Sequence, residues 1–132
     1  MGFSEIDHTA DCAVRVWGDD LTSLFVEAAR GMNHCAGAQV GNGPRVVRDL
    51  LIEASDTEGL LVSFLGDLIF AQESDNVGFD LFDIRVSDRR AAGRLSGARL
   101  ENLARPIKAV TYHSLRVRRS ARGYETQIVF DV

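Results

Sequence analysis

The chain has 132 residues, of which 45% are hydrophobic and 26% are charged. That length and composition fit one globular domain spanning 1–132, large enough to bury a core without disulfides or metals. No apolar run approaches the roughly 20 residues that cross a bilayer, and no secretory leader pattern precedes the first predicted strand. We therefore expect a cytoplasmic protein without membrane contact.

The net charge of −4 is unevenly distributed. Residues 1–83 carry a net charge of −11, and residues 84–132 carry +7. The global pI near 5.3 disfavours a protein that holds RNA by itself. The arginines of the second part fit either a patch for phosphate or an acidic partner, or simply the solvated faces of strands. They are Arg85, Arg89, Arg90, Arg94, Arg99, Arg105, Arg116, Arg118, Arg119 and Arg122.

The first part of the chain predicts a strand followed by a helix. Apolar and polar residues alternate over 11–18, which indicates a strand with Asp11 on its more polar face. Asp20 offers an N-cap for a helix that runs to about Cys35 and stops near Gly37.

A second helix is predicted after a strand over 45–54 and capping residues at 55–58. Its apolar residues recur at helical spacing, and such a stripe on one helix is usually core. The stripe consists of Leu60, Leu61, Phe64, Leu65, Leu68 and Ile69.

The rest of the chain predicts strands, with Gly93 and Gly97 indicating twist or bulges and an irregular segment at 101–109 around Pro106. The predicted strands are 79–87, 91–100, 111–119 and 123–132, the last two joined by a hairpin turn at 121–123. The resulting order, β-α-β-α-β-β-β-β, predicts an α+β fold in which two amphipathic helices pack on a mostly antiparallel sheet.

The two cysteines, Cys12 and Cys35, lie in predicted regular structure. We expect buried, reduced thiols and no disulfide. A zinc site using them with His8 and His34 is the alternative, but His8 and Cys12 would share a face only in a helix, and this segment is predicted to be extended.

The two ends of the chain carry the candidate metal ligands. Asp11 and Asp131 lie at strand ends on the more polar faces, and the terminal carboxylate of Val132 adds another oxygen donor. If these ends meet, a cation would neutralise the clustered carboxylates. Oxygen ligands suit Ca²⁺ or Mg²⁺, with Mn²⁺ as a further candidate. Strand-end aspartates that simply meet water are the simpler alternative.

Two further residues are candidates for the functional surface. Lys108 is the only lysine beside fourteen arginines, and a compact ammonium can meet a phosphate or carboxylate as a point charge; chance retention is the alternative. His8 fits a metal ligand, a general base or a polar cap. Because no local Ser-His-Asp or Cys-His signature is present, we predict no catalytic residue.

These residues lie in four blocks that resemble the archease family in the correct order over nearly the whole chain. The blocks are Ile6-Asp7-His8-Thr9-Ala10-Asp11 with Val16-Trp17-Gly18, Leu60–Leu65 through Ile69-Phe70, Ile107–His113, and Phe130-Asp131-Val132. Cys12 departs from the pattern, since an aliphatic residue is usual there, and Thr22-Ser23 stands where acidic residues are common.

The resemblance implies a small α+β protein that is not an enzyme but activates an RtcB-type RNA ligase in tRNA splicing or RNA repair. It would promote guanylylation of the ligase histidine and multiple turnover, meeting RNA and GTP only through the ligase. It assigns a divalent metal to Asp11 and Asp131 with Val132 nearby, and a place on the functional surface to Lys108, with His8 adjacent. The alternatives are a free-standing metal-dependent phosphate-ester hydrolase and a chaperone or RNA-binding adaptor.

Overall fold

The computed structural model describes residues 1–6 and 12–132, which form two helices and nine strands in that part of the chain. The elements in chain order are β1 (Gly2–Ile6), β2 (Cys12–Gly18), α1 (Leu21–Ala36), β3 (Ala38–Val40), β4 (Val46–Glu53), α2 (Thr57–Asp75), β5 (Val77–Val86), β6 (Arg90–Leu103), β7 (Ala109–Thr111), β8 (Arg118–Ser120) and β9 (Gly123–Asp131). None of the described helices is long and apolar enough to span a bilayer.

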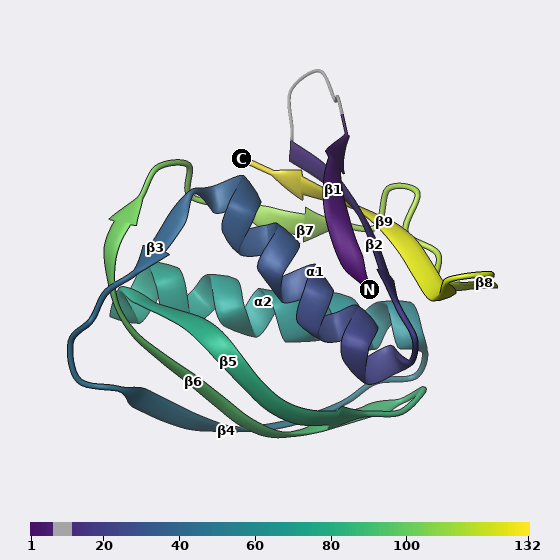
Figure 1. The fold of residues 1–132 in the computed structure, drawn as a ribbon, viewed down its shortest axis with the longest axis horizontal. Helices are drawn as coiled ribbons and strands as arrows, with labels where there is room; N and C mark the ends of the chain where they lie inside the picture. Colours follow the sequence, from purple (N-terminus) through teal and green to yellow (C-terminus); the bar gives the residue numbers. More distant parts are fainter. Residues whose placement is uncertain (7–11) are drawn as a thin grey trace.

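The strands form two antiparallel sheets with the helices between them (Figure 1). The first sheet has the order β1-β2-β9-β7, with β8 also paired to β9. The second has the order β3-β6-β4, with β5 paired to β6. Helix α1 packs mainly on β2, while α2 contacts β5 and β6 on one side and β7 on the other. The predicted α+β class is confirmed, with two sheets in place of the single sheet expected.

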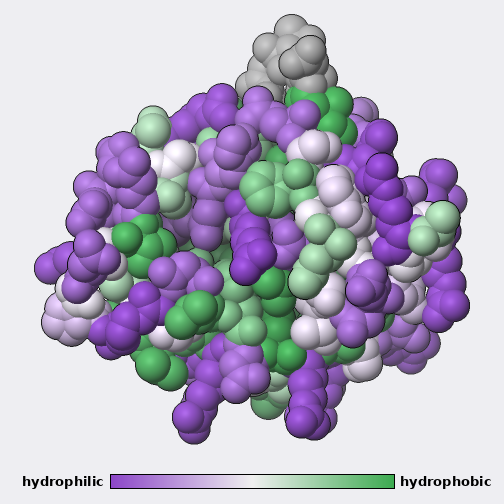
Figure 2. Space-filling view, in the orientation of Figure 1, coloured by the Kyte–Doolittle hydropathy of each residue, from purple (hydrophilic) through white to green (hydrophobic). Residues whose placement is uncertain are grey.

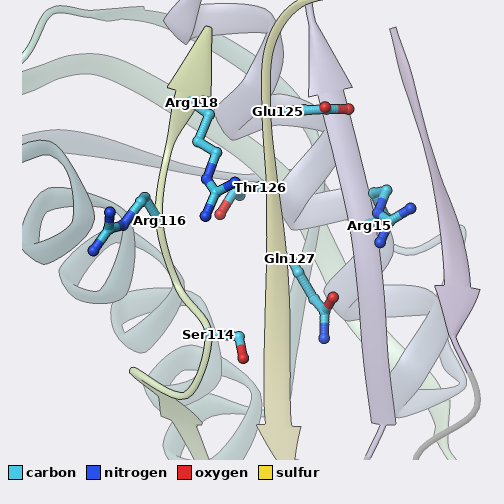
Figure 3. A pocket seen from close by; sticks show the side chains of 7 residues that line it. All are labelled: Arg15, Ser114, Arg116, Arg118, Glu125, Thr126 and Gln127. Carbon is cyan, nitrogen blue, oxygen red and sulfur yellow. The ribbon is translucent and has the colours of Figure 1, made fainter. Parts of the chain in front are cut away.

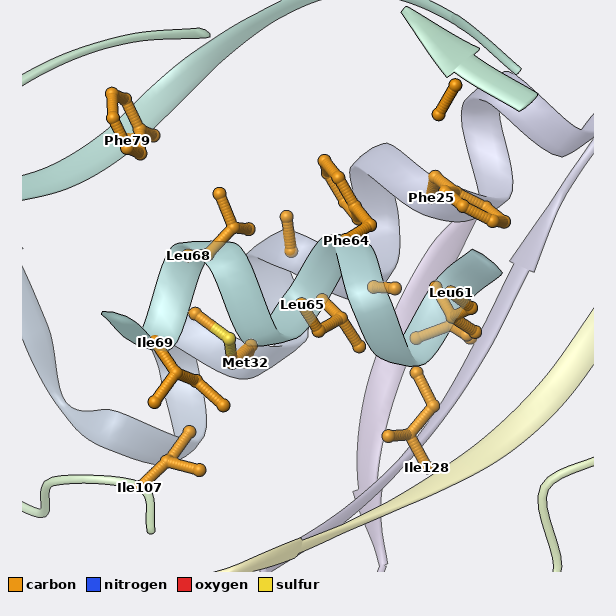
Figure 4. Close-up of a cluster of buried hydrophobic side chains, with 14 of the residues drawn as sticks. Phe25, Met32, Leu61, Phe64, Leu65, Leu68, Ile69, Phe79, Ile107 and Ile128 are labelled. Carbon is orange, nitrogen blue, oxygen red and sulfur yellow. The ribbon is translucent and has the colours of Figure 1, made fainter. Parts of the chain in front are cut away.

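The core lies where the two helices face each other and the sheets (Figure 4). Every member of the predicted α2 stripe is buried, and the ring of Phe64 lies 5.5 Å from that of Phe25 on α1. Each fully buried side chain of this size contributes roughly 1.5–3 kcal/mol before entropy costs. The helix starts also follow the prediction, since Asp20 and Asp56 accept capping hydrogen bonds of 2.7 Å from the backbone N–H groups of Ser23 and Gly59.

A small polar network joins both helices to the second sheet inside this core. The Gln72 side-chain amide donates to Asn33 Oδ1 at 3.0 Å, and Asn33 Nδ2 donates to the Phe79 carbonyl at 3.0 Å. Gln72 is buried and Asn33 half-buried, and amides that satisfy one another in this way fix the mutual position of the elements that carry them.

The structure differs from the sequence prediction chiefly in the strands. Strands β1 and β3 were not predicted, and β6 continues to Leu103 through part of the segment expected to be irregular. The strand predicted over 111–119 is wrong as one element, because β7 ends at Thr111 and β8 starts only at Arg118. Between them Leu115 N–H bonds the Tyr112 carbonyl in a turn.

The glycines of β6 mark an irregularity, as predicted. The pairing of β5 with β6 shifts register between Phe79 and Leu81, opposite Gly97. A Cβ at Gly97 would overlap the backbone of β5, so the strands approach closely only because this residue has no side chain.

The cysteine prediction is wrong. Cys12 at the start of β2 and Cys35 at the end of α1 form a disulfide, and both are buried with at most 2% of their surface exposed. The two positions lie far apart in sequence but have Cα atoms 5.9 Å apart, within the range that a disulfide can bridge. The packing of α1 against β2 brings the two cysteines together, and the spacing of the cysteines in the sequence does not reveal this tertiary contact.

Candidate functional site at the ends of β7 and β9

Lys108 and Asp131 lie side by side at one end of the first sheet. The backbone N–H of Lys108 donates to the Asp131 carbonyl at 2.7 Å, and the next residue, Ala109, pairs with Asp131 in the ladder of β7 and β9. Both side chains are exposed, whereas Ile107 beside them is buried with 2% exposure and anchors the segment. An ammonium and a carboxylate thus extend from neighbouring, hydrogen-bonded positions of the backbone.

The same end of the sheet contains the start of β2. Cys12 pairs with Phe130, the residue before Asp131, so the described ladder runs up to this end (Figure 1). Asp11 and His8, both expected in the site, lie outside the described residues. Val132 is half-buried, and its side chain packs against the core next to Asp131.

An apolar hollow adjoins Lys108. It has a volume of about 320 Å³ and lies between α2 and the start of β7, where it is lined by Val62, Gly66, Ile69, Phe70, Glu73, Lys108, Ala109 and Val110. Phe70 is 64% exposed, which is unusual for so large an apolar side chain on a helix whose other face is core. Phe70 was not among the predicted site residues, although its position one residue beyond the buried stripe was a usable signal.

The cysteines do not provide a zinc site in this structure. Glu5, Cys12 and Cys35 bring potential ligand atoms within 4.8 Å of one another, but the two sulfurs are bonded to each other and offer no thiolate. His34 instead contacts Glu5, with Nε2 and Oε1 3.1 Å apart, and lies against the ring of Phe3. Among the described residues, no group of three potential ligands includes Asp131.

The arginines of the second half do not form one patch. Arg85, Arg89, Arg90, Arg94 and Arg99 lie on the second sheet and its connecting turn, and Arg116, Arg118, Arg119 and Arg122 lie near β8 and β9. Two of the latter stack on aromatic rings: Arg119 lies 5.1 Å from the Tyr124 ring centroid, and Arg122 lies 4.4 Å from that of Trp17. The face shown in Figure 2 is hydrophilic around most of its rim, with apolar side chains gathered nearer its middle.

Comparison with known proteins gives a consistent match over the whole described domain. Residues 3–132 match the model of the Archease protein family (MTH1598/TM1083). The chain is 29% identical over 140 residues to the Protein archease of Methanopyrus kandleri, with all of both chains covered. It is 30% identical to the Protein archease of Methanosarcina mazei, covering 98% of this chain and 95% of that relative.

Two solved structures have the same fold. One is the crystal structure of an archease and possible chaperone from Thermotoga maritima, with a TM-score of 0.71 and 22% identity over 98% of this chain and 96% of the other. The other is the solution structure of a Methanobacterium thermoautotrophicum protein, with a TM-score of 0.72 and 23% identity over 99% of both chains.

Proposed function

Because the chain belongs to the archease family, we propose that it is a non-catalytic protein cofactor that activates an RtcB-type RNA ligase. In this role it promotes guanylylation of the ligase histidine and multiple turnover, in tRNA splicing or RNA repair. It meets RNA and GTP through the ligase. The observation that carries the proposal is the joint exposure of Lys108 and Asp131, whose backbones are hydrogen-bonded at one sheet end.

The chemistry of these two side chains fits assistance to a phosphoryl transfer. Such reactions depend mainly on positioning and on charges arranged before the reaction starts. The Lys108 ammonium supplies a point charge suited to a phosphate, and among the described residues no carboxylate forms an ion pair with it. Because the backbones of Lys108 and Asp131 are bonded, only their side chains need to be ordered when a partner approaches.

A divalent metal remains part of the proposal. Asp131 offers a hard, exposed oxygen donor of the kind that Ca²⁺, Mg²⁺ or Mn²⁺ prefers, and Asp11 and Val132 are the other expected donors. The described residues alone supply too few ligands for such a site, so the role of Asp11 is essential to this part of the proposal. When bound, the cation would add positive charge near the nucleotide phosphates.

We assign ligase contact to the surface formed by Lys108, Asp131 and Phe70. Lys108 and Phe70 line the same hollow between α2 and β7, which combines an apolar wall with one cation and one carboxylate, that of Glu73. In protein–protein interfaces, aromatic side chains often contribute most of the binding energy, and charged side chains surround them at the solvent-exposed rim.

The direct test is a guanylylation assay of a cognate ligase with and without this protein, in Mg²⁺, Mn²⁺ and Ca²⁺. We expect stimulation by the wild type, and a loss of about tenfold or more with Lys108→Ala, as for removal of a charge-assisted contact. Lys108→Arg keeps the charge but not the compact shape, so it should restore only part of the stimulation.

Two results would contradict the proposal. One is the absence of stimulation by the wild-type protein in all three metals. The other is turnover of a model phosphodiester by the purified protein alone, which would favour the hydrolase alternative.

A further inference from the structure

The first sheet is interrupted along one side of β9. Strand β9 pairs with β8 up to Glu125 and with β7 from Val129 onward, so its residues 126–128 have no partner strand on that side. The chain between β7 and β8 bows away from β9 at this point. A hollow of about 400 Å³ opens in the interruption, lined by Arg15, Ser114, Arg116, Arg118, Glu125, Thr126 and Gln127 (Figure 3).

The bowed segment is held in place by contacts to the body of the protein. The Val117 N–H donates to Glu58 Oε2 on α2 at 2.9 Å, and Leu115 and Val117 pack against the core. These contacts hold the segment away from β9, and the hollow lies between the two.

The hollow is strongly cationic. Arg15 enters from β2, while Arg116 and Arg118 come from the bowed segment and the start of β8, against a single carboxylate at Glu125. Across the described part of the chain, none of the three guanidinium groups has an ion-pair or hydrogen-bond partner. The neighbouring Arg119, by contrast, donates to the Tyr124 hydroxyl at 3.0 Å. Three unpaired guanidinium groups around one hollow favour an anion.

The wall of the hollow also contains a polar group that lacks a partner. Thr126 is 5% exposed, and its Oγ1 is a buried side-chain atom without a hydrogen-bond partner in the described structure. Thr126 and Arg118 both line the hollow, and Figure 3 draws them over one another in projection. A buried hydroxyl without a partner destabilises a protein, so a ligand oxygen that bonds it would relieve that cost. The Ser114 hydroxyl and the Gln127 amide add two more donors around the hollow.

We propose that this hollow between β9 and the 112–118 segment is a phosphate-binding site, in which Arg15, Arg116 and Arg118 hold the anion and Thr126 donates a hydrogen bond to it. The ligand is a phosphate group, carried either by a free nucleotide or by a nucleic-acid strand. The site is separate from Lys108 and Asp131, and its occupation does not depend on the ligase.

The test is titration calorimetry of the protein alone with three probes: inorganic phosphate, GMP, and an RNA oligomer that has hydroxyl groups at both ends. The first two carry a free or terminal phosphate, and the third carries only diesters. We expect at least one probe to bind, with an affinity that falls as salt is raised. The probe that binds most tightly identifies the source of the phosphate.

Two pairs of arginine substitutions distinguish contacts made inside the hollow from the effect of the overall positive charge on phosphate affinity. Arg116→Gln/Arg118→Gln should weaken binding by about tenfold or more. Its matched control is Arg89→Gln/Arg90→Gln, which removes the same charge from exposed positions at the second sheet and should leave affinity nearly unchanged. Thr126→Val should weaken binding by about three- to tenfold while raising Tm by a few degrees, because it removes a buried hydroxyl without a partner.

The proposal is overturned if no probe binds the wild-type protein, or if both arginine pairs reduce affinity equally. Unchanged phosphate affinity in Thr126→Val would likewise contradict the role given to its hydroxyl. None of these results bears on ligase stimulation, since no ligase is present in the assay.

Discussion

The two sheets of this protein use their central strands differently. In the second sheet β6 pairs with β5 over Ala91–Arg99, with β4 over Arg90–Gly97 and with β3 over Leu100–Leu103. Between the stretches paired with β4 and β3, the Gly41 N–H bonds the Arg99 carbonyl, so the chain stays against β6 there. In the first sheet β9 is fully paired with β2, but its other side is shared by two short strands that leave a gap between them. Both candidate sites lie on that second side of β9.

The difference matches the two places to which we assign function. Along β6, neighbouring strands and the Gly41 N–H bond its backbone groups, which leaves mainly side chains for recognition. The interrupted sheet instead has a strand end, with Lys108 beside Asp131, and a gap lined by arginines. Both features place charged side chains on a backbone that the rest of the sheet holds in position.

The largest expected effect comes from the buried side of α2, which both sheets cover. Phe64 is fully buried between Phe25 and Phe82, and Phe64→Ala should reduce the free energy of unfolding by about 3–5 kcal/mol. Phe70→Ala on the exposed side should change it by less than about 1 kcal/mol, yet weaken ligase stimulation. Urea unfolding measures the first quantity, and equal destabilisation by both variants would contradict the assignment of Phe70 to a surface.

The next effect concerns the disulfide, which joins β2 of the interrupted sheet to α1. It closes a sequence separation of 23 residues, so Cys12→Ala/Cys35→Ala should reduce the free energy of unfolding by about 3 kcal/mol. Urea unfolding with and without reductant provides the control, because reductant should destabilise the wild type and leave the double variant unchanged. A wild-type protein that unfolds identically in both conditions would show that the bridge contributes nothing.

The smallest effect lies on α2 between the sheets. Desolvation raises the pKa of Asp67, so the folded chain keeps this proton to a higher pH than the unfolded chain does. Its contribution to stability is therefore highest below the unfolded value of 3.8 and falls as pH rises through the folded value. Asp67→Asn should abolish that decline and stabilise the protein at neutral pH by at most a few tenths of a kcal/mol, measured as unfolding free energy against pH. If the unfolding free energy of the variant fell more steeply with pH than that of the wild type, the upward direction of the Asp67 pKa shift would be contradicted.

Local patterns in the sequence were sufficient for the helices but not for the edges of the sheets. The stripe from Leu60 to Ile69 and the caps at Asp20 and Asp56 were correctly interpreted, since the energies involved arise within a few residues. The split of the strand predicted over 111–119 was missed, because it depends on a hydrogen bond from Val117 to Glu58, 59 residues away.

For the candidate site, too, the sequence indicated individual residues but not the tertiary contacts between them. Lys108 stood out in the sequence as a single lysine, and Asp131 as a strand-end carboxylate, but their adjacency required the pairing of β7 with β9. The disulfide was missed because only the packing of α1 on β2 brings its two halves together. Likewise, nothing near Thr126 in sequence indicates that it lies beside three arginines from elsewhere in the chain.

The central claim is that the β7–β9 end of the interrupted sheet acts on a ligase through Asp131. The most direct measurement is the rate of ligase histidine guanylylation with Asp131→Asn, compared with Asp83→Asn, an exposed aspartate on β5 of the second sheet. We predict that Asp131→Asn folds normally and loses stimulation by about tenfold or more, while Asp83→Asn stimulates like the wild type. Full stimulation by Asp131→Asn would contradict the account.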